Sequence, residues 1–200
     1  MAGIDKFLSS SLTEKIKKNL DPKILKNVER ELFLDCGMSI KLSIEHFGHF
    51  IDILKKNSGM DINKFQKDCF NEIIQIKKHN DRYSLKIIDD SLSDKILQLA
   101  GDSESRKILL TIFENDLPIP DILKKSNVPK TSGYRKIENM ILNGIIIETG
   151  RILSDSKKVS KFKCCFDEIK VNLNKNKTET EVIFNSEIFE KSSCLKIFSK

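Results

Sequence analysis

Hydrophobic residues recur at helical spacing through most of the first eighty positions of the chain. Turn residues at Asp21-Pro22, Gly37 and Ser58-Gly59 divide the pattern into four segments that begin at residue 12. The three longer segments carry one apolar stripe each: Ile24, Leu25, Val28, Leu32 and Phe33; Leu42, Ile44, Phe47, Phe50, Ile51 and Leu54; and Phe65, Phe70, Ile73, Ile74 and Ile76. Four amphipathic helices are expected, and they predict a small helical bundle over residues 1–80.

Hydrophobic residues again recur at helical spacing after Asp102, and capping, proline and turn residues mark where each helix begins and ends. Asp102 and Ser103 are good N-cap residues for a helix whose apolar face carries Ile108, Leu109, Ile112 and Phe113. Pro120 suits the first turn of a short second helix at 121–125. Ser126, Asn127 and Val128 then form a turn, with Val128 placed to fill the angle between two helices.

A third helix and a β-hairpin complete this region. Pro129 opens the helix, which carries Ile137, Met140 and Ile141 on one side and ends at Gly144. Residues 145–147 favour a strand because they are β-branched, and residues 160–166 supply its partner. A winged helix-turn-helix domain has this order of elements: a helix, a short helix, a tight turn, a third helix and a charged hairpin. We therefore expect such a domain over residues 102–185.

The remaining segments define the expected domain organisation. Residues 81–101 are expected to form a linker with a short helix at 92–99, and residues 186–200 a flexible tail. Residues 168–185 alternate like two strands around an Asn-Lys-Asn-Lys turn and could lengthen the sheet of the hairpin. The expected fold is therefore mainly α with a small β wing, with an N-terminal helical bundle for regulation or dimerisation followed by a C-terminal winged helix-turn-helix domain.

Positive charge is concentrated in the expected winged helix. The chain has a net charge of +6, and the segment from Lys130 to Cys165 contains eight basic and three acidic residues. The first hundred residues are nearly balanced, with 17 basic and 15 acidic residues. A basic patch confined to one module is the electrostatic pattern of a protein that binds nucleic acid, so we expect double-stranded DNA as the partner.

The third helix and the hairpin supply the candidate DNA-binding residues. The exposed positions expected to contact DNA are Lys130, Thr131, Ser132, Tyr134, Arg135, Lys136 and Asn139 on the helix, and Arg151, Lys157, Lys158 and Lys161 on the hairpin. Arg135 is expected to read bases in the major groove, and the lysines to contact phosphates. Tyr134 could instead cover the edge of the core.

The string GYRKIENMILNGIIIETGRILSDSKKVSKFKCCFDEIKVNL at 133–173 resembles small archaeal transcription regulators of the ArsR-like winged-helix type. The resemblance implies sequence-specific binding by the third helix and backbone contact by the wing, at Thr131, Ser132, Arg135, Lys136 and Arg151. The Cys-x-Cys metal motif of that family is absent before the third helix, so metal sensing is not implied. Residues 1–80 faintly resemble the nitrosopumilus output domain, a helical domain that accompanies regulatory modules.

Two other readings stay open at this stage. A winged helix can be a protein-interaction or dimerisation module without sequence-specific DNA binding, and the N-terminal domain could bind a protein partner or a second copy. His46 and His49 lie three residues apart, with Cys36 and Cys69 on flanking helices, which is compatible with a metal or redox sensor. These side chains are more often core or rim residues of a bundle.

Other function classes lack their usual residues. The chain has no Gly-rich phosphate loop, no Gly-x-Ser-x-Gly motif and only three histidines, so we expect neither an enzyme nor a cofactor. No segment is expected to cross a membrane, and the first residues lack the apolar core of a signal peptide. The five scattered cysteines favour reduced thiols and a cytoplasmic location.

Overall fold

The structure is a computed structural model that describes residues 3–154 and 157–199. The helices are α1 (Gly3–Asn19), α2 (Pro22–Cys36), α3 (Ile40–Ser43), η1 (Ile44–His46), α4 (Phe47–Asn57), α5 (Ile62–Asn71), α6 (Asp90–Gly101), α7 (Ser103–Ile112), α8 (Ile119–Ser126), α9 (Lys130–Leu142), α10 (Ser186–Lys191) and η2 (Leu195–Phe198). The strands are β1 (Ile74–His79), β2 (Arg82–Ile87), β3 (Ile146–Ser154), β4 (Lys157–Cys164), β5 (Glu168–Leu173) and β6 (Thr178–Asn185).

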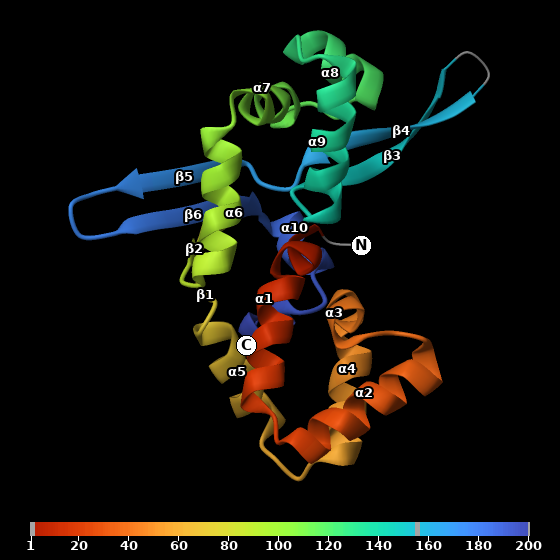
Figure 1. Cartoon of the computed structure of the whole chain (residues 1–200), viewed down its shortest axis with the longest axis vertical. Helices are drawn as coiled ribbons and strands as arrows, with labels where there is room; N and C mark the ends of the chain where they lie inside the picture. Colours follow the sequence, from red (N-terminus) through yellow and green to blue (C-terminus); the bar gives the residue numbers. More distant parts are fainter. Residues whose placement is uncertain (1–2, 155–156, 200) are drawn as a thin grey trace.

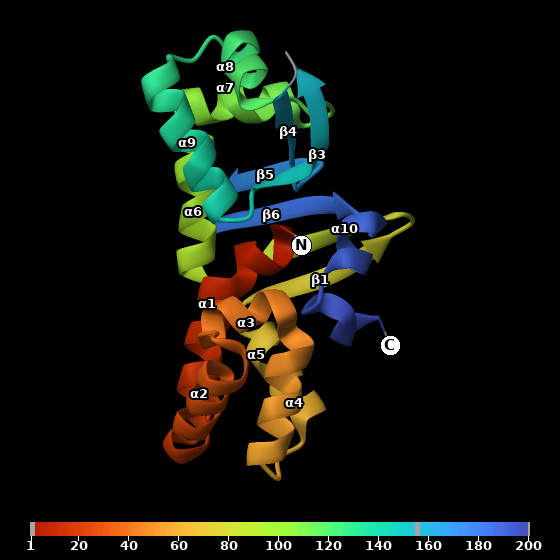
Figure 2. The same ribbon diagram turned by 90° about the vertical axis from the view of Figure 1, so that its right-hand side faces the viewer.

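The molecule is elongated, with a four-stranded sheet near its middle (Figure 1). Helices α2, α4 and α5 lie at one end, and α7, α8, α9 and the β3–β4 hairpin lie at the other (Figures 1 and 2). All sheet neighbours are antiparallel, in the order β1-β2-β6-β5, and α6 packs on β2, β5 and β6. Helix α1 crosses the centre, so the buried side chains of both ends form one continuous core.

Local signals set the ends of several helices. The Asp21 side chain accepts hydrogen bonds from the backbone N–H groups of Lys23 and Ile24, and Pro22 occupies the first turn of α2. Gly37 ends that helix in the left-handed conformation, at φ 63°. Along the part of the chain that the structure describes, no helix is both long and apolar enough to cross a membrane.

The sequence-based expectation of a single helix over residues 61–78 is wrong. Helix α5 ends at Asn71, and β1 begins at Ile74. Ile74 and Ile76 alternate with Gln75 and Lys77, a period of two that fits a half-buried strand. Both isoleucines lie opposite apolar residues of β2, in the pairs Ile74↔Ile87 and Ile76↔Leu85, and this cross-strand packing overrides the helical reading.

The expected linker at 81–101 is corrected in part: residues 82–87 form a central strand of the sheet, whereas the short helix expected at 92–99 is observed as α6. Strand β2 pairs with β1 on one side and with β6 on the other, where Leu85 lies opposite Val182. The strands expected at 168–185 are observed as β5 and β6, but they join β2 and not the β3–β4 hairpin. The sheet therefore unites segments that the sequence assigned to two separate domains.

The expectation of a flexible tail over 186–200 is wrong for the residues described there. Ile188, Phe189, Cys194 and Leu195 are buried, within α10, η2 and the turn between them. Ser192 and Ser193 donate hydrogen bonds to the buried carboxylate of Asp5 in the first turn of α1. The C-terminal segment is thus part of the core.

The helices and hairpin expected between residues 102 and 166 are observed. Val128 is buried in the turn between α8 and α9. Gly133 of α9 faces Leu123 of α8 so closely that a Cβ atom there would overlap the leucine side chain. Strands β3 and β4 pair antiparallel as a separate two-stranded sheet, and a β-bridge between Leu117 and Phe162 ties this hairpin to the segment before α8.

Candidate nucleic-acid interface

Helix α9 presents a broad polar face to solvent. Gly133, Ile137 and Met140 are buried on one side. The exposed residues follow at helical spacing on the other side: Lys130, Thr131, Tyr134, Arg135, Glu138, Asn139 and Leu142. Five of the seven candidate residues on this helix are therefore accessible to a partner, and one carboxylate, Glu138, lies among them.

The other two candidate residues of α9 are engaged inside the protein. The Lys136 ammonium lies 2.6 Å from the Asp102 carboxylate and 3.6 Å from that of Glu104. The Ser132 hydroxyl donates to Glu104 across 3.3 Å. Because Asp102 and Glu104 stand at the N-terminus of α7, these contacts hold α9 against α7.

The Lys136 pair gives a testable pH dependence. The hydrogen bonds from Lys136 and from Ser105 hold the pKa of Asp102 at about 2, below its usual 3.8. A lowered pKa in the folded state stabilises the fold at neutral pH, and this contribution is lost as the pH falls from about 4 to about 2. Asp102→Asn keeps a side-chain oxygen that can cap α7, so it removes mainly the ion pair.

We expect Asp102→Asn to lower the free energy of unfolding near pH 7 by about 0.5–1 kcal/mol, a small value because 38% of the Asp102 side chain is exposed. Urea unfolding of both proteins between about pH 7 and pH 3 would measure this difference, which should shrink toward the acid end. A difference that stays constant over this range would contradict the assignment.

The base of the β3–β4 hairpin is held by a second charged cluster. The Lys161 ammonium lies 2.7 Å from Asp116, which also accepts a hydrogen bond from Thr149 across 3.0 Å. These two contacts lower the pKa of Asp116. Lys161 therefore fixes the hairpin to the loop after α7, whereas Lys157 and Lys158 are exposed near its far end.

Arg151 is also paired, although it remains on the surface. Its Nε atom lies 3.1 Å from the Glu148 carboxylate, which in turn accepts a hydrogen bond from Ser160 across 2.7 Å. The pair is exposed, so water and salt screen it. Arg151 can therefore exchange Glu148 for a phosphate at little cost.

Two further cations lie beside the candidate residues of α9. Lys124 and Lys125 are exposed in the last turn of α8. The turn at 126–129 brings the end of α8 next to the start of α9, so Lys124 and Lys130 line one shallow depression. The signal for them in the sequence is the Lys-Lys pair itself, at the end of the short second helix.

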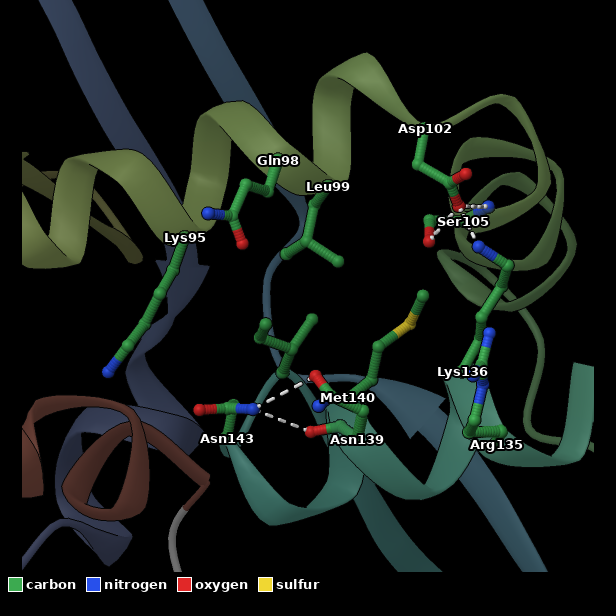
Figure 3. A pocket seen from close by; sticks show the side chains of 11 residues that line it. Lys95, Gln98, Leu99, Asp102, Ser105, Arg135, Lys136, Asn139, Met140 and Asn143 are labelled. Carbon is green, nitrogen blue, oxygen red and sulfur yellow. Dashed lines mark hydrogen bonds and ion pairs between the residues drawn. The ribbon is translucent and has the colours of Figure 1, made fainter. Parts of the chain in front are cut away.

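A groove of about 560 Å³ separates α6 from α9 (Figure 3). The α6 wall carries Lys95, Gln98 and Leu99, and the α9 side carries Arg135, Asn139 and Asn143. Met140 and Ile145, both buried, form the floor. Arg135 and Asn139 thus belong both to the outer face of α9 and to this groove, which the sequence could not indicate because α6 was expected in a linker.

The possible metal or redox site of the N-terminal region does not assemble. The rings of His46 and His49 are 6.5 Å apart, and Cys69 is buried beside Asn19 of α1. Burial raises the pKa of Cys69 to about 11, so the thiolate needed for metal binding is disfavoured. Within residues 3–154 and 157–199, no group of three or more His, Cys, Asp or Glu side chains is placed to hold a metal ion.

Comparison of the chain with protein-family models, with curated proteins and with solved structures gives no match.

Proposed function

We propose that the protein is a DNA-binding transcription regulator that reads duplex DNA with α9 and contacts phosphates with the β3–β4 hairpin. The observation that carries this proposal is the exposed face of α9, where Lys130, Thr131, Arg135 and Asn139 lie together. An α-helix fits the major groove of B-form DNA, and arginine and asparagine are the usual partners of guanine and adenine there. The order of α7, α8, α9 and the hairpin supports a winged helix-turn-helix, and the ArsR-like type is proposed from the sequence resemblance at 133–173 alone.

The charge distribution supports separate roles for the two kinds of contact. Lys130, Lys124 and Lys125 surround the turn before α9, and Lys157 and Lys158 stand on the hairpin. Phosphate contacts from these lysines would supply most of the affinity and make it fall steeply with salt. Lys136, Ser132 and Lys161 would act indirectly, because their contacts hold α9 and the hairpin in place.

Capture of fragmented genomic DNA by the purified protein, followed by sequencing, tests this proposal. We expect the wild type to enrich a shared motif at near-physiological salt and Arg135→Ala to lose it. The substitution should cost about 1–3 kcal/mol on the best site and less on random DNA. Arg30→Ala, at an exposed arginine of α2 on the opposite end of the molecule, is the matched control and should behave as wild type.

Equal losses of Arg135→Ala on specific and random DNA would remove Arg135 as a base reader. Lys130→Ala tests the phosphate contacts in the same way. Loss of one phosphate contact should weaken binding to all sequences and reduce the slope of log binding constant against log salt concentration by about 1.

A second function, docking of another protein, is favoured by apolar side chains in the same region. Leu142 of α9 and Leu153 of the hairpin are 68% and 73% exposed. Under this alternative, DNA association would be weak, indifferent to sequence and unchanged by Arg135→Ala, while a stable protein partner would be lost on Leu142→Ser.

A further inference from the structure

The α6–α9 groove combines an apolar floor with hydrogen-bonding walls. Met140 and Ile145 line it and are buried. Leu99, on the α6 side, adds to this apolar surface (Figure 3). Ligand sites of cofactor size have volumes of about 300–1,000 Å³. At about 560 Å³ the groove falls within this range. Eight of the eleven residues that line this groove are polar or charged, so hydrogen bonds and ion pairs would carry most of the recognition.

The groove is positively charged. Its charged lining residues are Lys95, Arg135, Lys136 and Asp102, and the last two neutralise each other across 2.6 Å. Within the described ranges, neither Lys95 nor Arg135 lies within 4.0 Å of a carboxylate oxygen. Two cations are thus available to a ligand.

Lys95 is the more unusual of the two cations, because its side chain is half-buried. Burial, with a smaller effect from nearby Lys41, lowers the pKa of Lys95, whereas Asp89 and Glu14 act in the opposite direction. Asp89 is itself occupied by Lys15 and by the Ser11 hydroxyl. A bound anion would therefore stabilise the charged form of Lys95.

The two cations stand at opposite ends of the groove. Lys95 lies at one end, beside Asn143, the C-cap residue of α9. Arg135 lies at the other end, beside the Asp102–Lys136 ion pair (Figure 3). Asp102, the C-cap of α6, is seven positions after Lys95, which corresponds to about 10 Å along the helix. Gln98 and Asn139 lie between the ends, and their amides can both donate and accept hydrogen bonds.

We propose that this groove binds a nucleoside monophosphate, with the phosphate beside Lys95; the Asn143 amide group does not bind it, because it donates to the backbone and side-chain oxygens of Asn139. The base lies over Leu99 and Met140, and its polar edge faces Gln98, Asn139 and Arg135. A mononucleotide has the required form, an anion at one end and a flat ring with donors and acceptors at the other. Because Arg135 and Asn139 also belong to the face proposed to read DNA, the nucleotide and the duplex exclude each other; this regulatory part rests on the proposed function.

Calorimetric titration of the full chain with AMP, GMP, CMP and UMP tests the site in the absence of DNA. Inorganic phosphate and the four nucleosides are the reference ligands, because they separate phosphate recognition from base recognition. We expect at least one monophosphate to bind about tenfold more tightly than either of its parts, a difference of about 1.4 kcal/mol.

Variants locate the binding. Lys95→Gln should weaken the preferred monophosphate about tenfold, and Lys95→Arg should keep most of the affinity because it keeps the charge. Lys26→Gln, at an exposed lysine of α2, is the matched control and should bind as wild type. Thermal unfolding of each variant shows whether it is folded.

The site is overturned if no monophosphate binds more tightly than inorganic phosphate, or if folded Lys95→Gln binds as the wild type does. The titrations contain no DNA, so nucleotide binding can be observed even if DNA capture finds no motif. Likewise, DNA capture can find a motif even if no nucleotide binds. If both succeed, the preferred nucleotide should release captured DNA from the wild type at about tenfold lower concentration than from Lys95→Gln, whose DNA-reading residues are intact. Retention of DNA at saturating nucleotide would overturn the competition.

Discussion

Gly144→Ala is expected to lower the free energy of unfolding by about 3–4 kcal/mol, through backbone strain and overpacking together. Gly144 has a φ of 72°, which costs other residues because their Cβ atom approaches the backbone. The N–H groups of Gly144 and Ile145 donate to the carbonyls of Ile141 and Met140, the hydrogen-bond pattern that ends a helix at a left-handed glycine. Replacement therefore strains the end of α9.

The surroundings of Gly144 add a second cost. A Cβ atom would overlap the carbonyl oxygen of Gly3 and lie 2.6 Å from the backbone nitrogen of Phe7, both in α1. Neither atom can move without shifting the helix, since Phe7 is buried. The start of α1 is thus packed directly against the corner between α9 and β3, and the substitution should loosen both.

Urea unfolding of Gly144→Ala and of a control measures this effect. Gly150→Ala is the matched control, because Gly150 also lies in the α9–hairpin region but a Cβ atom there has nothing within 4 Å. The control should change the free energy of unfolding by no more than about 0.5 kcal/mol. Equal stability of the two variants would show that α1 does not pack against this corner.

Asp5→Ala is expected to cost about 3 kcal/mol and to release the C-terminal segment. The Asp5 carboxylate is 1% exposed and accepts four hydrogen bonds from three consecutive residues. The donors are the Ser192 hydroxyl, the Ser193 N–H at 2.7 Å, the Ser193 hydroxyl at 2.9 Å and the Cys194 thiol at 3.1 Å. Each buried donor left without an acceptor costs about 1–3 kcal/mol, partly relieved by relaxation and water entry.

Amide hydrogen exchange distinguishes this effect from general destabilisation. Exchange should accelerate most in residues 192–198, because their anchor to α1 is lost. Asp90→Ala is the matched control: Asp90 is likewise an acidic residue in the first turn of a helix, but it is exposed. The prediction fails if Asp5→Ala and Asp90→Ala leave exchange in residues 192–198 equally slow.

The part of the fold that was predictable has short-range causes. Asp102 caps α7 by accepting a hydrogen bond from the Ser105 N–H, three residues later. Gly144 ends α9, and its N–H donates to the carbonyl of Ile141, three residues earlier. The polar face of α9 was also predictable, because helical spacing alone places Thr131, Arg135 and Asn139 on one side. Such signals can be read from neighbouring positions without knowledge of the fold.

The candidate site was predictable only in its exposed residues. Lys136 and Lys161 are lysines in a basic segment, and nothing in their own sequence neighbourhood distinguishes them from Lys130 or Lys158. Their partners, Asp102 and Asp116, lie 34 and 45 positions away and meet them only after α7, α9 and the hairpin have packed. Which lysines remain available to a ligand is therefore a property of the tertiary structure.

The sequence by itself determined the helices from 103 to 142, the turn between α8 and α9, and the β3–β4 hairpin, because capping, proline and glycine positions act over a few residues. The tertiary structure decided that β2 pairs with β6, that Ser192 reaches Asp5 across 187 positions, and that α6 and α9 enclose a groove. Each of these contacts joins two segments that are far apart in the sequence. Nothing in the sequence of either segment indicates that it meets the other. Local preferences of the residues allow several pairings of these segments. Burial of apolar surface, which depends on the whole chain, selects one of them.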